Sequence, residues 1–288
     1  ILAINNRFGE NSTDGYTVFD LPVPRQRLIH VHGSDLELGK VYQPELGIQA
    51  GPNAFVRALN AGGPVTGVWA EWQAEARAGY EAGFDLPDLP SPVDMGKVTA
   101  YLRDVLPKDA IITNGAGNFA IWSGRFLKYG PAMRLLAPQS GAMGYGIPAA
   151  VAAKVVHPER RVVCFAGDGD FQMTCQELAT AAQAGAQPVI LILNNGIYGT
   201  IRAHQERNYP ERVSGTEMVN PDFSALARVY GFHGERVERT EDFADAFARA
   251  CASPTGAVLD LVISPEALTP RVTLSQMRAA GLRKRDSM

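Results

Sequence analysis

The feature of this chain that most constrains its fold is the Gly-Asp-Gly motif at Gly167–Gly169, followed by the pair Asn194–Asn195. Asp168 and Asn195 are 27 positions apart, and the residues between them read as a helix, a turn and an apolar strand. The strand Val162–Ala166 before the first motif is apolar throughout, which is typical of a central parallel strand. Each motif therefore follows a strand. Because ligands of open parallel sheets bind beyond the carboxyl ends of the strands, we expect both motifs to meet there.

Oxygen-bearing side chains in these two motifs predict a site for magnesium and phosphate. Asp168 and Asn195 supply carboxylate and amide oxygens, which are ligands that Mg²⁺ prefers. The glycines let a phosphate approach the backbone, and the following helix points its amino end at that phosphate. Asp170 is expected to cap this helix, Phe171–Ala184, with its carboxylate turned away from the phosphate. Its N–H, and that of Gly169, would then face the phosphate. The competing explanation is a tight turn closed by an Asx cap.

Helical and strand patterns alternate regularly over residues 94–265, with short connections between them. This alternation predicts an α/β domain with a mostly parallel sheet and helices on both faces. The expected helices cover residues 94–106, 119–128, 144–156, 171–184, 223–230 and 242–250. The expected strands cover residues 110–113, 133–136, 161–166, 189–193, 235–237 and 258–263.

The first part of the chain, residues 1–60, reads as strand, loop, strand and helix. The second strand is expected at 28–32, and Asn53 is expected to cap a helix over 54–59. Because two strands do not make a stable sheet alone, we expect this piece to be part of a larger, Rossmann-like central domain. The chain opens on the apolar run Ile1–Ile4 without a methionine, so we expect a fragment or a chain preceded by further residues.

Two segments flank the α/β region. Residues 61–93 are expected to form a connector, with a polar helix over 68–82 followed by an extended, proline-rich stretch. Residues 266–288 are expected to form a basic tail that is solvated or docked rather than an arm for nucleic acid.

Charge and cysteine usage narrow the classes of partner and compartment. The net charge of −3 gives no sign of a nucleic-acid or anionic-membrane partner. No apolar stretch approaches the ~20 residues that span a bilayer, and the run Pro188–Leu193 reads as a buried strand. Cys164, Cys175 and Cys251 lie far apart without a Cys-x-x-Cys spacing, which predicts reduced thiols in a cytoplasmic protein.

Three further segments are candidates for ligand binding. Ser140–Pro148 contains three glycines, which permit a close backbone pass before a helix. Thr113–Asn118 could cradle a phosphate through its N–H groups, although Asn118 could instead cap the next helix. Gly196–Gln205 is expected to line the substrate side of the site. Within it, His204 could donate a proton or contact the substrate, or it could be a histidine on a surface helix.

These motifs and their spacings resemble the diphosphate-anchoring segments of thiamine diphosphate (ThDP)-dependent 2-oxo acid decarboxylases and carboligases, in the acetolactate synthase-like branch. The resemblance runs from Ile1 to the tail, and residues 94–265 resemble the diphosphate-binding domain. It implies ThDP and Mg²⁺ as cofactors, a 2-oxo acid as substrate, and either decarboxylation or carboligation as the reaction. The alternatives are a non-catalytic ThDP-binding module for assembly or regulation, and a different α/β enzyme that uses the Gly-Asp-Gly motif for another phosphate ligand.

The resemblance also implies roles for individual residues. Mg²⁺ would be bound by the Asp168 and Asn195 side chains and by the main-chain oxygen of Ile197. The Gly141 carbonyl would accept a hydrogen bond from the 4′-amino group of ThDP, and Met143 would be the wedge that keeps the cofactor bent, unless it belongs only to the core. The full set of expected cofactor-binding residues is Asn118, Gly141, Met143, Gly167, Asp168, Gly169, Asp170, Asn195 and Ile197.

Three departures from the family pattern matter. The family uses a glutamate from a pyrimidine-binding domain, and no glutamate here matches it. That domain would come from a missing N-terminal part or from a partner chain in a homodimer or homotetramer, so we expect the 288-residue chain to be inactive alone. Acetolactate synthases carry tryptophan and methionine where this chain has His204 and Thr200, which argues against strict acetolactate synthesis. Residues Arg7–Asn11 depart from the family's FAD-binding segment, so FAD stays an open alternative that the sequence does not support.

Overall fold

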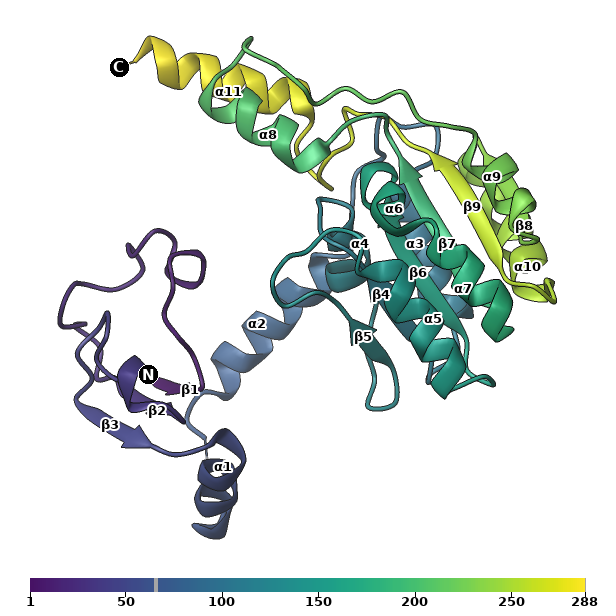
Figure 1. Ribbon diagram of the computed structural model, residues 1–288. Helices are drawn as coiled ribbons and strands as arrows, with labels where there is room; N and C mark the ends of the chain where they lie inside the picture. The colour runs from purple at the N-terminus through teal and green to yellow at the C-terminus, as the bar shows by residue number, and fades with distance from the viewer. Residues whose placement is uncertain (65–66, 288) are drawn as a thin grey trace. The chain divides into compact units, whose positions relative to one another are not determined.

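The computed structural model describes residues 1–64 and 67–287 (Figure 1). Contacts within the chain divide it into two compact units, residues 1–77 and residues 78–288. Helix α2 (Ala70–Ala82) crosses this division. The polar helix expected over 68–82 is confirmed, and it starts two residues later than expected.

The first unit is built on a small parallel sheet with the strand order β1-β2-β3. Its elements are β1 (Leu2–Ile4), β2 (Ile29–His32), β3 (Leu46–Gln49) and α1 (Pro52–Ala61). The third strand was not predicted, because the run of residues 46–49 is short and mostly exposed. The prediction that Asn53 caps the helix is wrong: Gly51 is the N-cap, and Pro52 occupies the first turn, where its missing N–H costs nothing.

The second unit contains a six-stranded sheet in which all neighbouring strands are parallel, in the order β5-β4-β6-β7-β9-β8. Its strands are β4 (Ile111–Asn114), β5 (Arg134–Leu136), β6 (Val162–Gly167), β7 (Val189–Asn194), β8 (His233–Val237) and β9 (Ala257–Val262). All six strands were predicted within a few residues of these bounds. The prediction of a parallel sheet in an α/β fold is confirmed.

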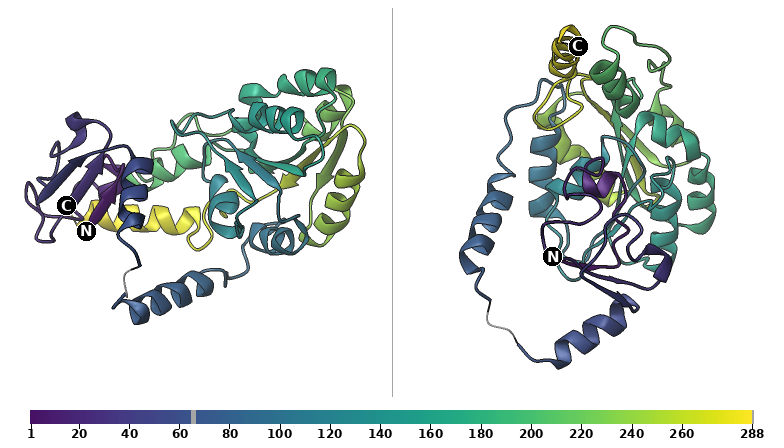
Figure 2. Two further views of the ribbon diagram at one scale, coloured as in Figure 1. Left: turned by 90° about the horizontal axis from the view of Figure 1, so that it is seen from below. Right: turned by 90° about the vertical axis from the view of Figure 1, so that its left-hand side faces the viewer.

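Both faces of this sheet are covered by helices (Figure 2). Successive residues of β6 point to opposite faces. Val163 and Phe165 belong to one apolar cluster, and Cys164 and Ala166 belong to the other. The first cluster includes residues from α3 (Met95–Val105), α4 (Ala120–Phe126) and α10 (Phe243–Ala252). The second includes residues from α5 (Gly146–Val156), α6 (Asp168–Thr174), α7 (Glu177–Ala184) and α9 (Phe223–Val229). The continuous apolar strands are explained by this burial on two sides.

The single helix expected over 171–184 is instead two helices, α6 and α7. The chain tightens between them, since the N–H groups of Leu178 and Ala179 donate to carbonyls three residues earlier, at 3.1 and 2.9 Å. Helix α6 also begins three residues earlier than expected, at Asp168, after Gly167 in the extended conformation. Asp170 therefore lies inside the first turn, and the prediction that it caps the helix is wrong.

The basic tail is a docked helix, α11 (Leu274–Asp286), which begins with a capping box between Thr273 and Gln276. It lies beside α8 (Gly199–Asn208), as Figure 1 shows, and packs against it. Apolar side chains of both helices share a buried cluster, and a Cβ at Gly281 would lie 2.5 Å from the Glu206 carbonyl oxygen. Of the two alternatives for the basic tail, solvated or docked, the docked one is therefore correct.

In the part of the chain that the structure describes, no helix is long and apolar enough to cross a membrane.

A buried carboxylate fastens α11 to α8. The side chain of Glu206 is fully buried and accepts hydrogen bonds from Arg278 at 2.5 and 2.8 Å and from Arg202 at 2.9 Å. The hydrogen bond from Arg278, together with the bond from Arg202, outweighs the opposing effect of burial and lowers the pKa of Glu206 to about 2. Because the charged form is favoured in the fold, this group stabilises the protein above the carboxyl's ordinary pKa and loses that contribution as pH falls.

We expect Glu206→Gln to lower the free energy of unfolding at pH 7 by about 3 kcal/mol, at the low end for a broken buried ion pair because Arg278 is partly exposed. The deficit should shrink as pH falls from 4.5 toward about 2, where the wild-type carboxyl becomes protonated. Urea unfolding of both proteins across this pH range measures the difference. Glu211→Gln, at a carboxylate 62% exposed, is the control. A deficit that does not change with pH would contradict the role given to the charge.

Candidate functional site

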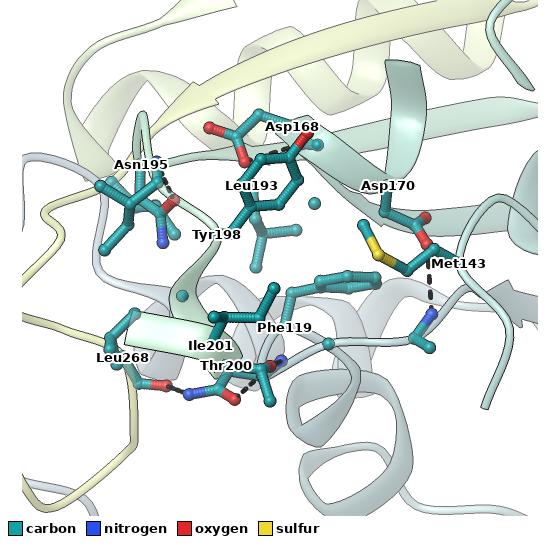
Figure 3. A pocket seen from close by; sticks show the side chains of 18 of the residues that line it. Phe119, Met143, Asp168, Asp170, Leu193, Asn195, Tyr198, Thr200, Ile201 and Leu268 are labelled. Carbon is teal, nitrogen blue, oxygen red and sulfur yellow. Dashed lines mark hydrogen bonds between the residues drawn. The ribbon is translucent and has the colours of Figure 1, made fainter. Parts of the chain in front are cut away.

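A pocket opens beyond the carboxyl ends of the central strands of the six-stranded sheet (Figure 3). Both polar motifs contribute to it, together with the loop after β4, the start of α8 and a segment after β9. Its lining residues are Ala116, Gly117, Asn118, Phe119, Trp122, Met143, Gly167, Asp168, Gly169, Asp170, Leu193, Asn195, Ile197, Tyr198, Gly199, Thr200, Ile201, Ile263, Ala267 and Leu268. The expected meeting of the two motifs at this edge is confirmed.

Asp168 is the first residue of α6 and is only 3% exposed. Its Oδ1 accepts from the Gly169 N–H at 2.9 Å, and its Oδ2 accepts from the Gly196 N–H at 2.7 Å and from Asn220 Nδ2 at 2.8 Å. Burial raises the pKa of Asp168, and these donors oppose that rise. The three donors are neutral, so a bound cation would relieve the cost of the buried charge. The Gly169 N–H, expected to face a phosphate, is used by Asp168.

Asn195 and Ile197 follow β7 in a tight loop. Asn195 Oδ1 accepts from the Ile197 N–H at 3.1 Å, so the Asx turn considered as an alternative is present. An amide oxygen has two lone pairs, and the second can still bind a metal. Ile197 forms an isolated antiparallel bridge with Glu217 in which the hydrogen bonds are made by its two neighbours. The Ile197 carbonyl is thus outside this bridge's hydrogen bonds.

These oxygens fit the predicted magnesium ligands. The Asp168 carboxylate, the Asn195 amide and the Ile197 main chain belong to residues that line one pocket, and all three would offer the oxygen ligands that Mg²⁺ prefers. Among the described residues, no group of three or more His, Cys, Asp or Glu side chains is placed to hold a metal ion. The predicted magnesium site differs from such a cluster, because it would combine one carboxylate with an amide oxygen and a main-chain oxygen.

Asp170 is buried and joins two loops to α6. Its Oδ1 accepts from the Ala116 N–H at 3.1 Å and from the Gly144 N–H at 2.9 Å. Within the described part of the chain its Oδ2 is buried without a hydrogen-bond partner, and burial raises the pKa of this carboxyl. Gly115 passes so close that a Cβ there would meet the Asp170 carboxylate. Gly144 has φ +81°, which favours glycine.

Asn118 connects the loop after β4 to α8. Its N–H donates to Thr200 Oγ1 at 3.0 Å, its Oδ1 accepts from the same hydroxyl at 2.6 Å, and its Nδ2 donates to the Leu268 carbonyl at 3.5 Å (Figure 3). The alternative that Asn118 caps the next helix is wrong, since Phe119 is the N-cap of α4. Contact of Asn118 with a diphosphate stays a prediction.

The remaining predicted residues are placed differently from one another. Met143 lines the pocket and is 38% exposed, so it is not a core residue. Gly141 has φ +68° with open space around its Cα, and it is not among the pocket-lining residues. His204 is exposed on α8 and is also not among them. The roles of Gly141 and His204 stay predictions.

Phe119 and Asn220 were not predicted as site residues, whereas Tyr198 lies in the segment Gly196–Gln205 that was expected to line the site. The rings of Phe119 and Tyr198 lie against Gly167 and Gly169, where a Cβ would come within 2.7 and 2.6 Å of them. Phe119 directly follows the segment Thr113–Asn118, and an aromatic residue at that place was the signal that could have identified it. Asn220 had no such signal, because it lies 52 positions from Asp168 in a segment without a pattern.

A parallel sheet with helices on both faces and a pocket of oxygen ligands at its carboxyl edge defines a cofactor-binding α/β domain. The family model for the thiamine pyrophosphate enzyme, C-terminal TPP binding domain, matches residues 115–261, and the chain belongs to this family.

Relatives support the same assignment. The chain is 32% identical over 269 residues to the acetolactate synthase large subunit of Parasynechococcus marenigrum (strain WH8102), covering 91% of this chain and 43% of the relative. It is 30% identical over 244 residues to the acetolactate synthase isozyme 2 large subunit of Escherichia coli (strain K12), covering 84% and 43%. It is 31% identical over 282 residues to the acetolactate synthase of Mycobacterium bovis (strain ATCC BAA-935 / AF2122/97), covering 93% and 45%. The chain therefore spans less than half the length of these relatives.

We expect Gly115→Ala to destabilise the second unit by about 2 kcal/mol, because the new methyl group would displace the Asp170 carboxylate from the two N–H groups that it joins. Gly124→Ala is the matched control, since a Cβ at this α4 position meets nothing within 4 Å and alanine favours the helix. Denaturant unfolding measures both. Equal stabilities of the two variants would show that the close approach at Gly115 carries no weight.

Proposed function

We propose that this chain binds the diphosphate of ThDP through Mg²⁺ at the pocket beyond β6 and β7. The observation that carries the proposal is the gathering of Asp168, Asn195 and Ile197 in one pocket at neighbouring strand ends. Membership of the thiamine pyrophosphate enzyme family supports the identity of the cofactor. When bound, ThDP would supply the electron sink for chemistry on a carbonyl carbon.

The protein's own contribution would be to hold the metal and to exclude water. Asp168 and Asn195 would hold Mg²⁺ with the main-chain oxygen of Ile197. Apolar side chains line much of the same pocket, among them Phe119, Leu193, Ile201 and Leu268. Such a lining lowers the local dielectric constant and strengthens the electrostatic interactions inside. Met143, exposed in the pocket, would provide the wedge against which the cofactor bends.

We propose that the reaction class is decarboxylation of a 2-oxo acid, carboligation, or both. The support is the relatives, which are named acetolactate synthases. The chain spans less than half of each of these relatives. The proposal therefore names a class of reaction and no particular substrate. His204 is exposed and outside the pocket lining, which makes Thr200, on the lining, the better candidate for a substrate contact.

The other half of the active site would come from a pyrimidine-binding domain outside residues 1–288. The ionisable carboxyl side chains among the described lining residues are Asp168 and Asp170, and no glutamate is among them. A glutamate from that domain, supplied by the same polypeptide or by the partner in a homodimer or homotetramer, would protonate the pyrimidine ring. We assign no residue to FAD.

We expect Asp168→Ala to weaken binding of Mg²⁺–ThDP by about 100-fold or more, because the variant loses the single carboxylate of the metal set. The fold should persist, since burial raises the pKa of this carboxyl and its removal relieves that desolvation. Isothermal titration calorimetry with ThDP and Mg²⁺ measures the affinity, and thermal unfolding checks the fold. Asp245→Ala, at an exposed position of α10, is the control. An unchanged affinity would mean that the metal site is assigned wrongly.

A further inference from the structure

Asn220 connects the proposed metal ligand to the interior of the sheet. It lies in the segment between α8 and α9, and its Nδ2 donates both to Asp168 Oδ2 and to Asn194 Oδ1, each at 2.8 Å. Its Oδ1 accepts from Gln172 Nε2 at 3.0 Å. An asparagine amide has two donor hydrogens, so both are used, and this side chain has one defined orientation.

The connection continues along one face of the sheet. Asn194 Nδ2 donates to Asp260 Oδ1 at 2.8 Å, and Arg236 donates to Asp260 Oδ2 at 3.1 Å. Asp260 on β9 pairs in register with Ile192 and Arg236. Because side chains alternate between faces, Asn194, two residues after Ile192, is on the same face as Asp260. The polar side chains thus run from the edge strand β8 through β9 and β7 to the pocket.

Asp260 is an unusual residue for this position, because it is fully buried in a strand whose other residues are apolar. A buried charge requires paired partners. Here the partners are one exposed cation, Arg236, and one amide, Asn194, which also accepts a hydrogen bond from Asn220. The carboxylate in this apolar strand is therefore explained by the two groups that it holds in place, Asn194 and Arg236.

The segment that presents Asn220 also holds the loop after β7. The Tyr198 N–H donates to the Thr216 carbonyl, and the Met218 N–H donates to the Gly196 carbonyl, both at 2.9 Å. Gly196 in turn donates to Asp168 at 2.7 Å. The backbone of this segment therefore positions the main-chain ligand, while its Asn220 side chain positions the carboxylate ligand.

We propose that Asn220 is a positioning residue for the metal site, which fixes the Asp168 carboxylate and is itself held by Asn194 and Asp260. The inference rests on the proposed function. Asn220 does not bind the metal. It sets the orientation of the oxygen that does, as partners of metal ligands do in other proteins, where their loss weakens metal affinity by roughly 10- to 100-fold.

The first experiment measures Mg²⁺ affinity with ThDP present, by isothermal titration calorimetry on the 288-residue chain. We expect Asn220→Ala to weaken Mg²⁺ binding by roughly tenfold, and saturating Mg²⁺ to restore wild-type binding of ThDP. Asn194→Ala should weaken Mg²⁺ binding less, and should add nothing when combined with Asn220→Ala, because it acts through that residue. Asn208→Ala, at the exposed end of α8, should behave as wild type.

Three results would overturn the proposal: wild-type Mg²⁺ affinity in Asn220→Ala, a loss that saturating Mg²⁺ does not repair, or additive effects of the two substitutions. Binding to neither ThDP nor Mg²⁺ by the wild-type chain would instead refute the proposed function. Amide hydrogen exchange of the ligand-free proteins decides the positioning role independently. Asn220→Ala should lose protection at the Gly196 N–H, which donates to Asp168. Unchanged protection there would refute the positioning role.

Discussion

The burial of two carboxylates at the end of β6 is the constraint on which the rest of this site depends. Asp168 and Asp170 are each at most 3% exposed. Asp170 accepts from the backbone N–H groups of two other loops, and Asp168 accepts from the N–H groups of Gly169 and Gly196 and from the Asn220 side chain. A buried carboxylate without donors is costly, so the loops must pass close to α6. That requirement explains glycine at 115, where a side chain would meet Asp170, and at 144, where φ is positive.

The two carboxylates perform different tasks because different groups surround them. Asp170 faces the loops after β4 and before α5 and joins them, which fixes the walls of the pocket. Asp168 faces the loop after β7 and the Asn220 side chain, whose donors are neutral. A divalent cation is the natural complement of the second arrangement, since it would offset the desolvation that raises the pKa of Asp168. One turn of helix thus carries both a structural clamp and a candidate metal ligand.

Sequence patterns predicted the parts of this molecule that depend on local or periodic burial. The strands of the large sheet are apolar because both faces are covered, and the motifs at their ends could be placed from that alone. Strand β3 was missed because it is largely exposed, and the division of α6 from α7 because no glycine or proline marks it. The role of Asp170 was misjudged because a local capping rule competed with two partners distant in sequence. Asn220 was missed for the same reason, since only the folded chain brings it to Asp168.

The docked C-terminal helix extends the dependence of the pocket to the end of the chain. Thr200, which closes a hydrogen-bonded link with Asn118, lies in the first turn of α8. Further along the same helix, Glu206 fastens α8 to α11 through Arg278. Leu268, whose carbonyl accepts from Asn118, precedes α11 in the chain. Its side chain belongs to the same apolar cluster as Leu274 and Met277 of α11. Because one helix carries both a pocket-lining hydroxyl and the anchor of the tail, a change that undocks α11 would also loosen this side of the pocket.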